Sequence, residues 1–208
     1  MSVTIHTMEI APRPIVVATN PYHLFREWFD AAERHEPAEA NAMTVATVNR
    51  DGVPSARTVL MKDWNDRGFV FYTNKESQKA SELRENPHAS LLFFWKSLGR
   101  QVRIDGTVED VTDAEADAYF ASRARISRLG AWASSQSRPL PDRATLERRL
   151  AEVEAKYPGE VVPRPPYWSG FRVLPRRIEF WQGMPYRPHD RVVYTRTEEV
   201  WVAGRLFP

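Results

Sequence analysis

Two guanidinium groups and an imidazole lie close together near the C-terminal end of the sequence, in the stretch PYRPHDRVVY. Arg187, His189 and Arg191 occupy alternate positions there. Alternate side chains of an extended chain point to the same side, so we expect these three groups to converge. Arginines bind anions, and a histidine beside them holds or donates a proton near neutral pH. The stretch therefore predicts a site for an anionic ligand with a proton-bearing group next to it.

Two more cations bracket the segment RTVLMK, which has the composition of a strand. Arg57 and Lys62 would point to opposite faces of a regular strand, unless a bulge or the strand end re-aims one of them. The spacing therefore favours two separate anion contacts, and two solvated surface charges are the alternative.

A further candidate anion site is the segment SQKASELREN (77–86), a predicted short helix that Pro87 stops. Ser77, Gln78 and Lys79 lie at its expected start, where free backbone N–H groups and the helix dipole attract anions. Ordinary capping of the helix by Ser77 explains the same residues equally well.

Phenol, guanidinium and hydroxyl groups recur at helical spacing in the segment YFASRARISRLGAWASSQS. Tyr119, Arg123 and Ser127 step by four residues, so a continuous helix would present all three to one phosphate group. A helix face with a frayed end is the alternative. Other polar residues that belong either to a pocket or to the surface are Gln101, Gln136 and Ser137.

Several other chemistries lack the residues that they need. The absence of cysteine excludes disulfides and thiol nucleophiles, and it favours a reducing, cytoplasmic location. We expect no metal site, because the histidines outside the C-terminal stretch have no partners at ligand spacing. Neither a phosphate-binding glycine loop nor a GxSxG elbow occurs. The cations are scattered singly among apolar strands and no apolar run spans a bilayer, so we expect neither nucleic acid nor membrane as a partner.

The elements that must position these groups are short strands with helices inserted between them. Asn20 and Pro21 predict the start of an amphipathic helix, and Thr112 with Glu115 forms a capping box at the start of another. A further helix is expected over roughly 142–156. Strand patterns include 69–73 and the largely apolar run 89–95, and we expect the second of these to be buried on both faces.

The first two strands, on either side of Asp51-Gly52, are joined by a tight turn, which parallel pairing cannot use. We therefore expect a mostly β fold, an antiparallel β-barrel with peripheral helices. No flexible linker divides the chain, so we expect a single domain over 20–208. The N-terminal stretch has no basic start followed by an apolar core, and we expect residues 1–19 to form a flexible arm.

Several blocks of the sequence resemble the pyridoxamine 5'-phosphate oxidase family in their order and approximate spacing. They are RTVLMK, FVFYTNKESQKASEL, LLFFWKSLGRQVRIDG, YFASRARISRLGAWASSQS, WSGFRVLPRRIEFWQG, RPHDR and the terminal RLFP. The resemblance runs from about residue 20 to the end of the chain. It implies an FMN-binding split β-barrel, in which a homodimer builds two flavin sites at its interface.

The resemblance also implies roles for individual residues. It assigns FMN binding to Arg57, Lys62, Tyr72, Thr73, Gln78, Lys79, Gln101, Gln136, Ser137, Trp181 and Arg191. It assigns the substrate phosphate to Lys62, Tyr119, Arg123 and Ser127, and it places Arg187 and His189 over the pyridine ring as catalytic residues. The implied reaction is the oxidation of pyridoxine or pyridoxamine 5'-phosphate to pyridoxal 5'-phosphate by dioxygen, with hydrogen peroxide as a product.

Some positions depart from the family pattern. Gln78 stands where arginine is common, Ala124 where proline is common, and Pro188 where an aliphatic residue is usual. The N-terminal arm has no Arg-x-x-Tyr motif. Relatives that act in phenazine biosynthesis share the barrel and FMN, so an oxidase of another reduced ring compound is one alternative. A non-catalytic protein that binds FMN or a B6 phosphate is the other.

Overall fold

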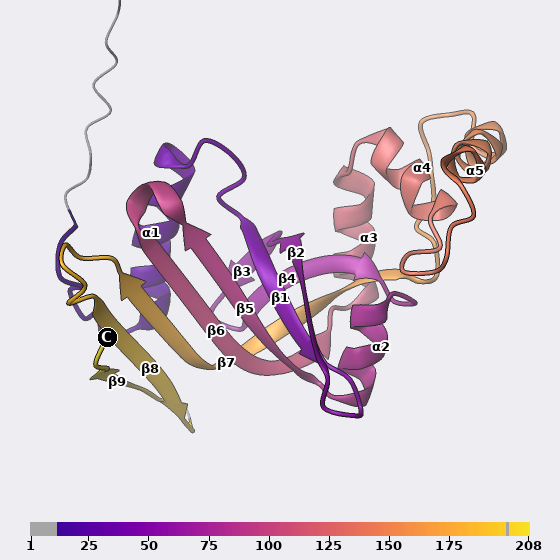
Figure 1. The fold of residues 1–208 in the computed structure, drawn as a ribbon. Helices are drawn as coiled ribbons and strands as arrows, with labels where there is room; N and C mark the ends of the chain where they lie inside the picture. The colour runs from indigo at the N-terminus through magenta and orange to yellow at the C-terminus, as the bar shows by residue number, and fades with distance from the viewer. Residues whose placement is uncertain (1–11, 199) are drawn as a thin grey trace, which may run out of the picture.

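The computed structural model describes residues 12–198 and 200–208, which form one curled antiparallel sheet with helices around it (Figure 1). The strand order is β2-β1-β5-β6-β7-β4-β3, and β8 and β9 continue from β7. The strands are β1 (Ala42–Val48), β2 (Pro54–Leu60), β3 (Asp63–Asn65), β4 (Gly68–Asn74), β5 (His88–Trp95), β6 (Arg100–Asp110), β7 (Trp168–Gln182), β8 (Asp190–Thr197) and β9 (Val200–Arg205). The helices are α1 (Pro21–His35), α2 (Gln78–Glu85), α3 (Asp113–Ser122), α4 (Arg125–Ala133) and α5 (Arg143–Lys156). The predicted mostly β, antiparallel fold with peripheral helices is confirmed.

Strand β7 links the two halves of the sheet. Its first part pairs with β4 and its last part with β8, while β6 pairs along most of its length. The β6–β7 register shifts between Asp105 and Gly106, where Pro175 lies opposite Gly106. Proline has no N–H to donate to the neighbouring strand, so it is tolerated at a bulge. The bulge also bends the strand. A side chain at Gly106 would place its Cβ 2.2 Å from the Leu174 carbonyl oxygen, so this close crossing requires glycine.

Helix α1 completes the hydrophobic core on one side of the sheet. Asn20 accepts a hydrogen bond from the Tyr22 N–H and Pro21 occupies the first turn, as the sequence predicted. Phe25 is fully buried and packs edge-on against Phe69 and Phe93, with ring centroids 4.9 and 5.5 Å away. Truncating such a ring costs about 3–5 kcal/mol, so α1 is an integral part of the fold.

Two other local signals in the sequence are confirmed. The β1–β2 hairpin turns at Gly52, whose φ is 81°, and the Asn49 side chain accepts hydrogen bonds from the N–H groups of Asp51 and Val53. The capping box of Thr112 and Glu115 begins α3. Helix α5 occupies the segment where a helix over 142–156 was expected.

Strand β5 differs from its prediction. Leu91, Phe93 and Trp95 are buried, but the side chains between them are not, and Phe94 is 57% exposed. The prediction of burial on both faces was wrong, because an apolar run does not show whether the same chain covers the second face. One face of β5 packs in the core, and the described residues cover the other face only in part.

The segment before α1 lies along the C-terminal strands over its described part. The Ile15 N–H donates to Asp190 Oδ2 at 2.6 Å, and the Tyr194 hydroxyl donates to the Ala18 carbonyl oxygen at 2.9 Å. Residues 1–11 lie outside the described residues. The flexible arm over 1–19 and the single domain over 20–208 therefore stay predictions. In the described part of the chain, no helix is long and apolar enough to cross a membrane.

Candidate functional site

A cleft of about 820 Å³ is lined by residues of α2, α3 and α4 among others. Figure 1 shows these three helices on the same side of the molecule. The volume of the cleft is in the range of about 300–1,000 Å³ that small-molecule sites occupy. Eleven predicted site residues line it: Arg57, Lys62, Tyr72, Thr73, Gln78, Lys79, Tyr119, Arg123, Ser127, Gln136 and Ser137. Four of these are cationic, and none of the described residues that line the cleft is acidic. The lining therefore favours an anionic ligand.

Arg57 reaches the cleft from β2 and is held by Glu82 of α2. Arg57 Nη2 lies 3.3 Å from Glu82 Oε2, which also accepts hydrogen bonds from the Ser55 hydroxyl at 2.7 Å and from the Thr47 hydroxyl. Gln78 Nε2 donates to the other carboxylate oxygen at 2.8 Å. Burial alone would raise the pKa of Glu82, but these hydrogen bonds and the charge of Arg57 lower it to about 2. Glu82 is therefore ionised near neutral pH and fixes the guanidinium of Arg57.

Lys79 is a buried cation at the start of α2. Its Nζ lies 3.1 Å from Thr73 Oγ1 and 3.1 Å from Gln136 Oε1. Burial, and then repulsion from Arg57, lower the pKa of Lys79 to about 8, although the charge of Glu82 opposes this shift. A cation that has lost its water in this way is stabilised by an anion that binds beside it.

The structure bears on two expectations from spacing. Arg57 and Lys62 line the same cleft, because β2 ends at Leu60 and Lys62 lies beyond the regular strand; that they make two separate anion contacts stays a prediction. Capping by Ser77 does not explain the start of α2, because its side chain makes no capping hydrogen bond.

One wall of the cleft is a stack of three aromatic rings. Tyr72 lies 4.1 Å from Tyr119 and 5.4 Å from Trp168, measured between ring centroids, with interplanar angles of 18° and 3°. The guanidinium carbon of Arg123 lies 4.9 Å from the Trp168 ring centroid. Arg123 Nη1 is buried and has no hydrogen-bond partner among the described residues. Such an unpaired donor is costly unless a ligand supplies an acceptor.

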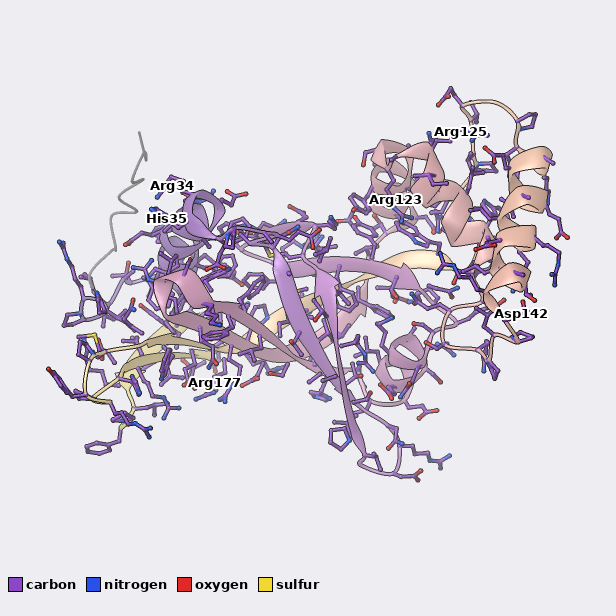
Figure 2. All side chains as sticks on the ribbon, turned by 45° about the horizontal axis from the view of Figure 1, so that its top comes forward. Arg34, His35, Arg123, Arg125, Asp142 and Arg177 are labelled. Carbon is purple, nitrogen blue, oxygen red and sulfur yellow. The ribbon has the colours of Figure 1, made fainter. Side chains whose placement is uncertain are left out.

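The expected continuous helix from Tyr119 to Ser127 is wrong. Helix α3 ends at Ser122, and Arg123 and Ala124 are extended, with ψ of 148° and 140°. Figure 2 shows Arg123 where α3 gives way to α4. The three residues share a cleft because the chain bends between the helices, and not because they share a helix face.

The other five predicted site residues form a second group on β6, β7, β8 and the turn before β8: Gln101, Trp181, Arg187, His189 and Arg191. Figure 1 shows β8 at the other end of the sheet from α3 and α4. Gln101 pairs with Trp181 between β6 and β7, and Trp181 pairs with Arg191 of β8. Strand β7 carries Trp168 at its cleft end and Trp181 near its other end, and 15 residues of extended chain span on the order of 50 Å. The second group therefore does not reach the cleft of its own chain.

Arg187 lies in a turn and not on a strand. Tyr186 and Arg187 have φ of 61° and 69°, in the left-handed region. The β7–β8 ladder ends at the pair of Gln182 and Asp190, so the chain must reverse direction between them. The predicted extended alternation from Arg187 to Arg191 is therefore wrong at Arg187.

His189 is fixed by the backbone of this turn. The Met184 N–H donates to His189 Nδ1 at 3.2 Å, and the His189 ring centroid lies 4.7 Å from that of Trp181. A backbone N–H only donates, so Nδ1 is the acceptor and the neutral ring carries its proton on Nε2. His189 thus offers an N–H donor at its outer nitrogen.

Arg191 is held by a buried carboxylate. Its Nε and Nη2 donate to Glu179 Oε1 at 2.9 and 2.7 Å. Glu179 Oε2 contacts Arg103 and Arg177, the latter labelled in Figure 2 on the far side of the sheet from Arg123. Burial would raise the pKa of Glu179, but hydrogen bonds from two of these arginines and the surrounding charges lower it.

Comparison with known proteins identifies the family. Residues 29–157 match the family described as "Pyridoxamine 5'-phosphate oxidase". The chain belongs to the pyridoxamine 5'-phosphate oxidase family. Residues 168–208 match a region described as "Pyridoxine 5'-phosphate oxidase C-terminal dimerisation region".

Relatives of this family member share most of its length. A protein named pyridoxine/pyridoxamine 5'-phosphate oxidase from Caulobacter vibrioides is 57% identical over 200 residues, which are 96% of this chain and 90% of the relative. One of the same name from Gluconobacter oxydans is 59% identical over 194 residues, covering 93% of this chain and 97% of the relative.

Solved structures agree with the split-barrel fold that the sequence predicted. PhzG from Burkholderia lata, in complex with tetrahydrophenazine-1-carboxylic acid, has a TM-score of 0.86 at 33% identity and covers 92% of this chain and 94% of its own. A pyridoxamine 5'-phosphate oxidase-related, FMN binding protein from Nostoc punctiforme has a TM-score of 0.73 at 17% identity, covering 92% of this chain and all of its own. At that identity the second likeness shows the fold alone.

Some residues of this pyridoxamine 5'-phosphate oxidase family site were not predicted from the sequence. Glu82 and Ser55 orient Arg57, and Trp168 supports the aromatic wall. Glu82 lies four residues after Gln78 on α2, a spacing that places the two side chains on one helix face, so this signal was available. Trp168 had no comparable signal, because it is brought to the cleft by pairing between β4 and β7.

Proposed function

We propose that this chain catalyses the FMN-dependent oxidation of pyridoxine 5'-phosphate or pyridoxamine 5'-phosphate to pyridoxal 5'-phosphate. Dioxygen is the electron acceptor and hydrogen peroxide is formed, and water releases ammonia when the amine is the substrate. The observation that carries this proposal is the cleft with four cations and an aromatic wall, in a chain that belongs to this oxidase family.

The donor set of the cleft fits FMN. Lys79 lies in the first turn of α2, where the helix dipole adds to its attraction for a phosphate group, and Arg57 lines the same cleft from β2. The described oxygen partners of Lys79 Nζ are three neutral groups, on Thr73, Ser77 and Gln136, which suits a site that binds an anion. Other polar groups available to the isoalloxazine and ribityl parts are Lys62, Tyr72, Thr73, Gln78, Gln136 and Ser137. Bound FMN would supply the hydride acceptor of the reaction and its reoxidation by dioxygen.

We assign the substrate phosphate to a second set of groups in the same cationic lining. Lys62, Tyr119, Arg123 and Ser127 offer two cations and two hydroxyl groups within one cleft. Arg123 Nη1 is a buried donor that lacks an acceptor among the described residues, and a phosphate oxygen would satisfy it. Anchoring the substrate by its phosphate orients the ring at a distance from the anchor, which lowers the entropic part of the barrier.

A second copy of this chain would complete each cleft. The group that contains Trp181, Arg187 and His189 cannot reach the cleft of its own chain, and it belongs to residues 168–208, the part that matches a dimerisation region. We infer a homodimer in which this group covers the partner's cleft, as the resemblance to the family implies. Arg187 would then hold the substrate ring in place and stabilise charge that develops on it.

His189 would act as a hydrogen-bond donor in this arrangement. The Met184 N–H occupies Nδ1, so only Nε2 is directed away from the turn, and in the neutral ring it carries the proton. The ring packs against Trp181, which limits its rotation. His189 therefore orients a substrate oxygen or nitrogen by donating to it, rather than removing a proton through Nδ1.

Anaerobic reduction of the flavin tests this function. The purified protein is loaded with FMN, excess FMN is removed, and pyridoxine 5'-phosphate is added without oxygen. We expect the visible absorbance of the flavin to bleach, and colour and peroxide to return when air is admitted. Retained flavin that stays oxidised with both B6 phosphates would refute the substrate assignment, and failure to retain FMN would refute the site.

A second candidate is the oxidation of another reduced ring compound, such as a phenazine precursor. It is favoured by the likeness to PhzG, a structure in complex with tetrahydrophenazine-1-carboxylic acid, at a TM-score of 0.86. Faster bleaching by a reduced phenazine carboxylate than by either B6 phosphate would support it. Tight binding without peroxide would instead indicate a non-catalytic binding protein. Cytoplasmic location stays a prediction from the cysteine-free composition, and cell fractionation tests it.

A further inference from the structure

Two largely buried arginines hold helix α3 against the sheet without lining the cleft. Arg164 precedes β7 and Arg172 lies within it, and their side chains are 14% and 2% exposed. Their partners are acidic residues in the first half of α3, and we call this set of contacts the α3 clamp. The roles assigned above to cleft residues do not include either arginine.

Arg164 makes three contacts of the α3 clamp. Its Nε donates to Asp117 Oδ1 at 2.5 Å and its Nη2 to Asp113 Oδ1 at 2.8 Å. Its Nη1 donates to the Trp168 carbonyl oxygen at 2.7 Å. One guanidinium therefore ties two turns of α3 to the backbone of the tryptophan that supports the aromatic wall.

Arg172 makes the deeper contact of the α3 clamp. Its Nη2 donates to Glu115 Oε1 at 2.6 Å, and Glu109 Oε1 lies 3.8 Å from its Nε. Arg172 Nε and Nη1 are buried without a hydrogen-bond partner among the described residues, so Glu115 is its principal partner. A buried guanidinium is stable only with such a carboxylate beside it.

Glu115 passes this constraint to the cleft. Its Oε2 caps the helix by accepting from the Thr112 N–H at 2.8 Å, while its carbonyl oxygen accepts from the Tyr72 hydroxyl at 3.3 Å. Tyr119 lies one helical turn further on and stacks on Tyr72. Arg123 directly follows α3 and lies over Trp168. The α3 clamp therefore sets where Tyr119 and Arg123 stand.

We propose that Arg172 and Arg164 are positioning residues that give the cleft its preference for a phosphorylated substrate. They hold α3 so that Tyr119 and Arg123 meet the phosphate, although neither arginine contacts it. This inference rests on the proposed function, because it takes Tyr119 and Arg123 as phosphate ligands.

The test compares Arg172→Met with a matched control, Arg67→Met. Arg67 is 62% exposed and pairs with Glu109 at 3.2 Å, so the control removes an arginine–carboxylate pair next to the α3 clamp. We expect Arg172→Met to raise KM for pyridoxine 5'-phosphate about tenfold, with kcat and the Kd for FMN within about twofold of the wild type. The ratio of kcat/KM for pyridoxine 5'-phosphate to that for pyridoxine should fall about tenfold, and Arg67→Met should leave it unchanged.

A binding measurement gives a readout that does not depend on turnover. Calorimetry on the FMN-loaded protein should show about tenfold weaker binding of pyridoxal 5'-phosphate to Arg172→Met, with little change for pyridoxal. Arg172→Lys, which keeps the charge, should recover part of the loss. If Arg172→Met does not fold, Arg164→Lys, a milder change at the more exposed arginine, is compared in the same way for phosphorylated and unphosphorylated ligands.

Equal losses for phosphorylated and unphosphorylated ligands would overturn the inference, because they indicate a general structural role. An unchanged ratio in a folded variant would also overturn it. A wild-type protein that binds B6 phosphates without oxidising them would refute the proposed reaction but leave the positioning role measurable by calorimetry.

Discussion

Raising the pH from 7 to 9 should weaken FMN binding about tenfold, because Lys79 loses its proton in the empty cleft. Its pKa is about 8 there, since burial and the charge of Arg57 disfavour the cation. A phosphate bound against Nζ restores the cation, so binding at pH 9 requires the uptake of a proton. Compared with the protein in which Lys79 is fully protonated, a group with a pKa of about 8 lowers the FMN affinity by a factor of about 11 at pH 9 and of only about 1.1 at pH 7.

The stability of the empty protein should change in the opposite direction. The pKa of Lys79 is lowered from its ordinary value of 10.5, so between about pH 8 and 10.5 the unfolded chain binds a proton that the folded protein does not. Stability rises with pH wherever the unfolded state binds more protons. As the pH rises above about 8, the contribution of Lys79 to stability therefore increases while the affinity for FMN falls. Unfolding caused by the deprotonation of Lys79 thus does not explain the loss of affinity.

Titration of flavin fluorescence at pH 7, 8 and 9 measures this dependence. Calorimetry in buffers of different ionisation enthalpy counts the protons taken up. Lys79→Met should bind FMN more weakly at pH 7 and lose most of the pH dependence, whereas Lys96→Met, at an exposed position, should retain it. A wild-type Kd that is constant from pH 7 to 9, or an equal pH dependence in Lys79→Met, would refute the reasoning.

Other expected outcomes concern both groups of site residues. Glu82→Gln should lower the free energy of unfolding by about 3 kcal/mol at pH 7 relative to the exposed Glu85→Gln, because the pKa of Glu82 is lowered from 4.5 to about 2. The difference between the two variants should shrink as the pH falls from about 4.5 towards 2. Denaturant titrations that show no difference at pH 7 would contradict this. His189→Gln, whose amide can donate near the Nε2 position, should keep more activity than His189→Asn, and nitrogen NMR shifts of the wild type should show the proton on Nε2; a proton on Nδ1 would contradict the assignment. Arg187→Ala should lower kcat about 100-fold with FMN occupancy unchanged in absorbance spectra, and wild-type turnover would remove Arg187 from the site. Phe94→Asp should shift the protein towards monomer in light scattering, because this 57% exposed ring lies beside Gln101 in the second group, and an unaltered dimer would place the interface elsewhere.

Local signals in the sequence predicted those parts of the fold that local interactions determine. Asn20 and Pro21 mark the start of α1, because a side-chain acceptor and a fixed φ both act within one turn. The hairpin at Gly52 and the capping box at Thr112 follow from equally short-range chemistry. Signals of this kind depend on residues within about four positions of each other, so the packing of distant segments did not change the local structures that they predict.

Predictions failed where the position of a residue depends on distant segments. The regular alternation that begins at Arg57 does not extend to Lys62, because β2 ends at Leu60 and strand ends are set by pairing with other strands. Arg123 leaves the helical path so that its guanidinium lies over Trp168, which is distant in the sequence. Phe94 is exposed because none of the residues in 12–198 and 200–208 covers it on the second face of β5. Family resemblance supplied the site residues, but only the structure showed that they form two separate groups.

The separation of these two groups along β7 has a consequence for dimers that contain two different variant chains: one variant can supply the group that is defective in the other. If each cleft takes its first group from one subunit and its second group from the other, a Lys79→Met chain paired with an Arg187→Ala chain forms one cleft with both defects and one with neither. Random pairing of equal amounts would leave about a quarter of all clefts intact. The two impaired proteins, unfolded and refolded together at a limiting FMN concentration, would therefore regain activity that neither shows alone.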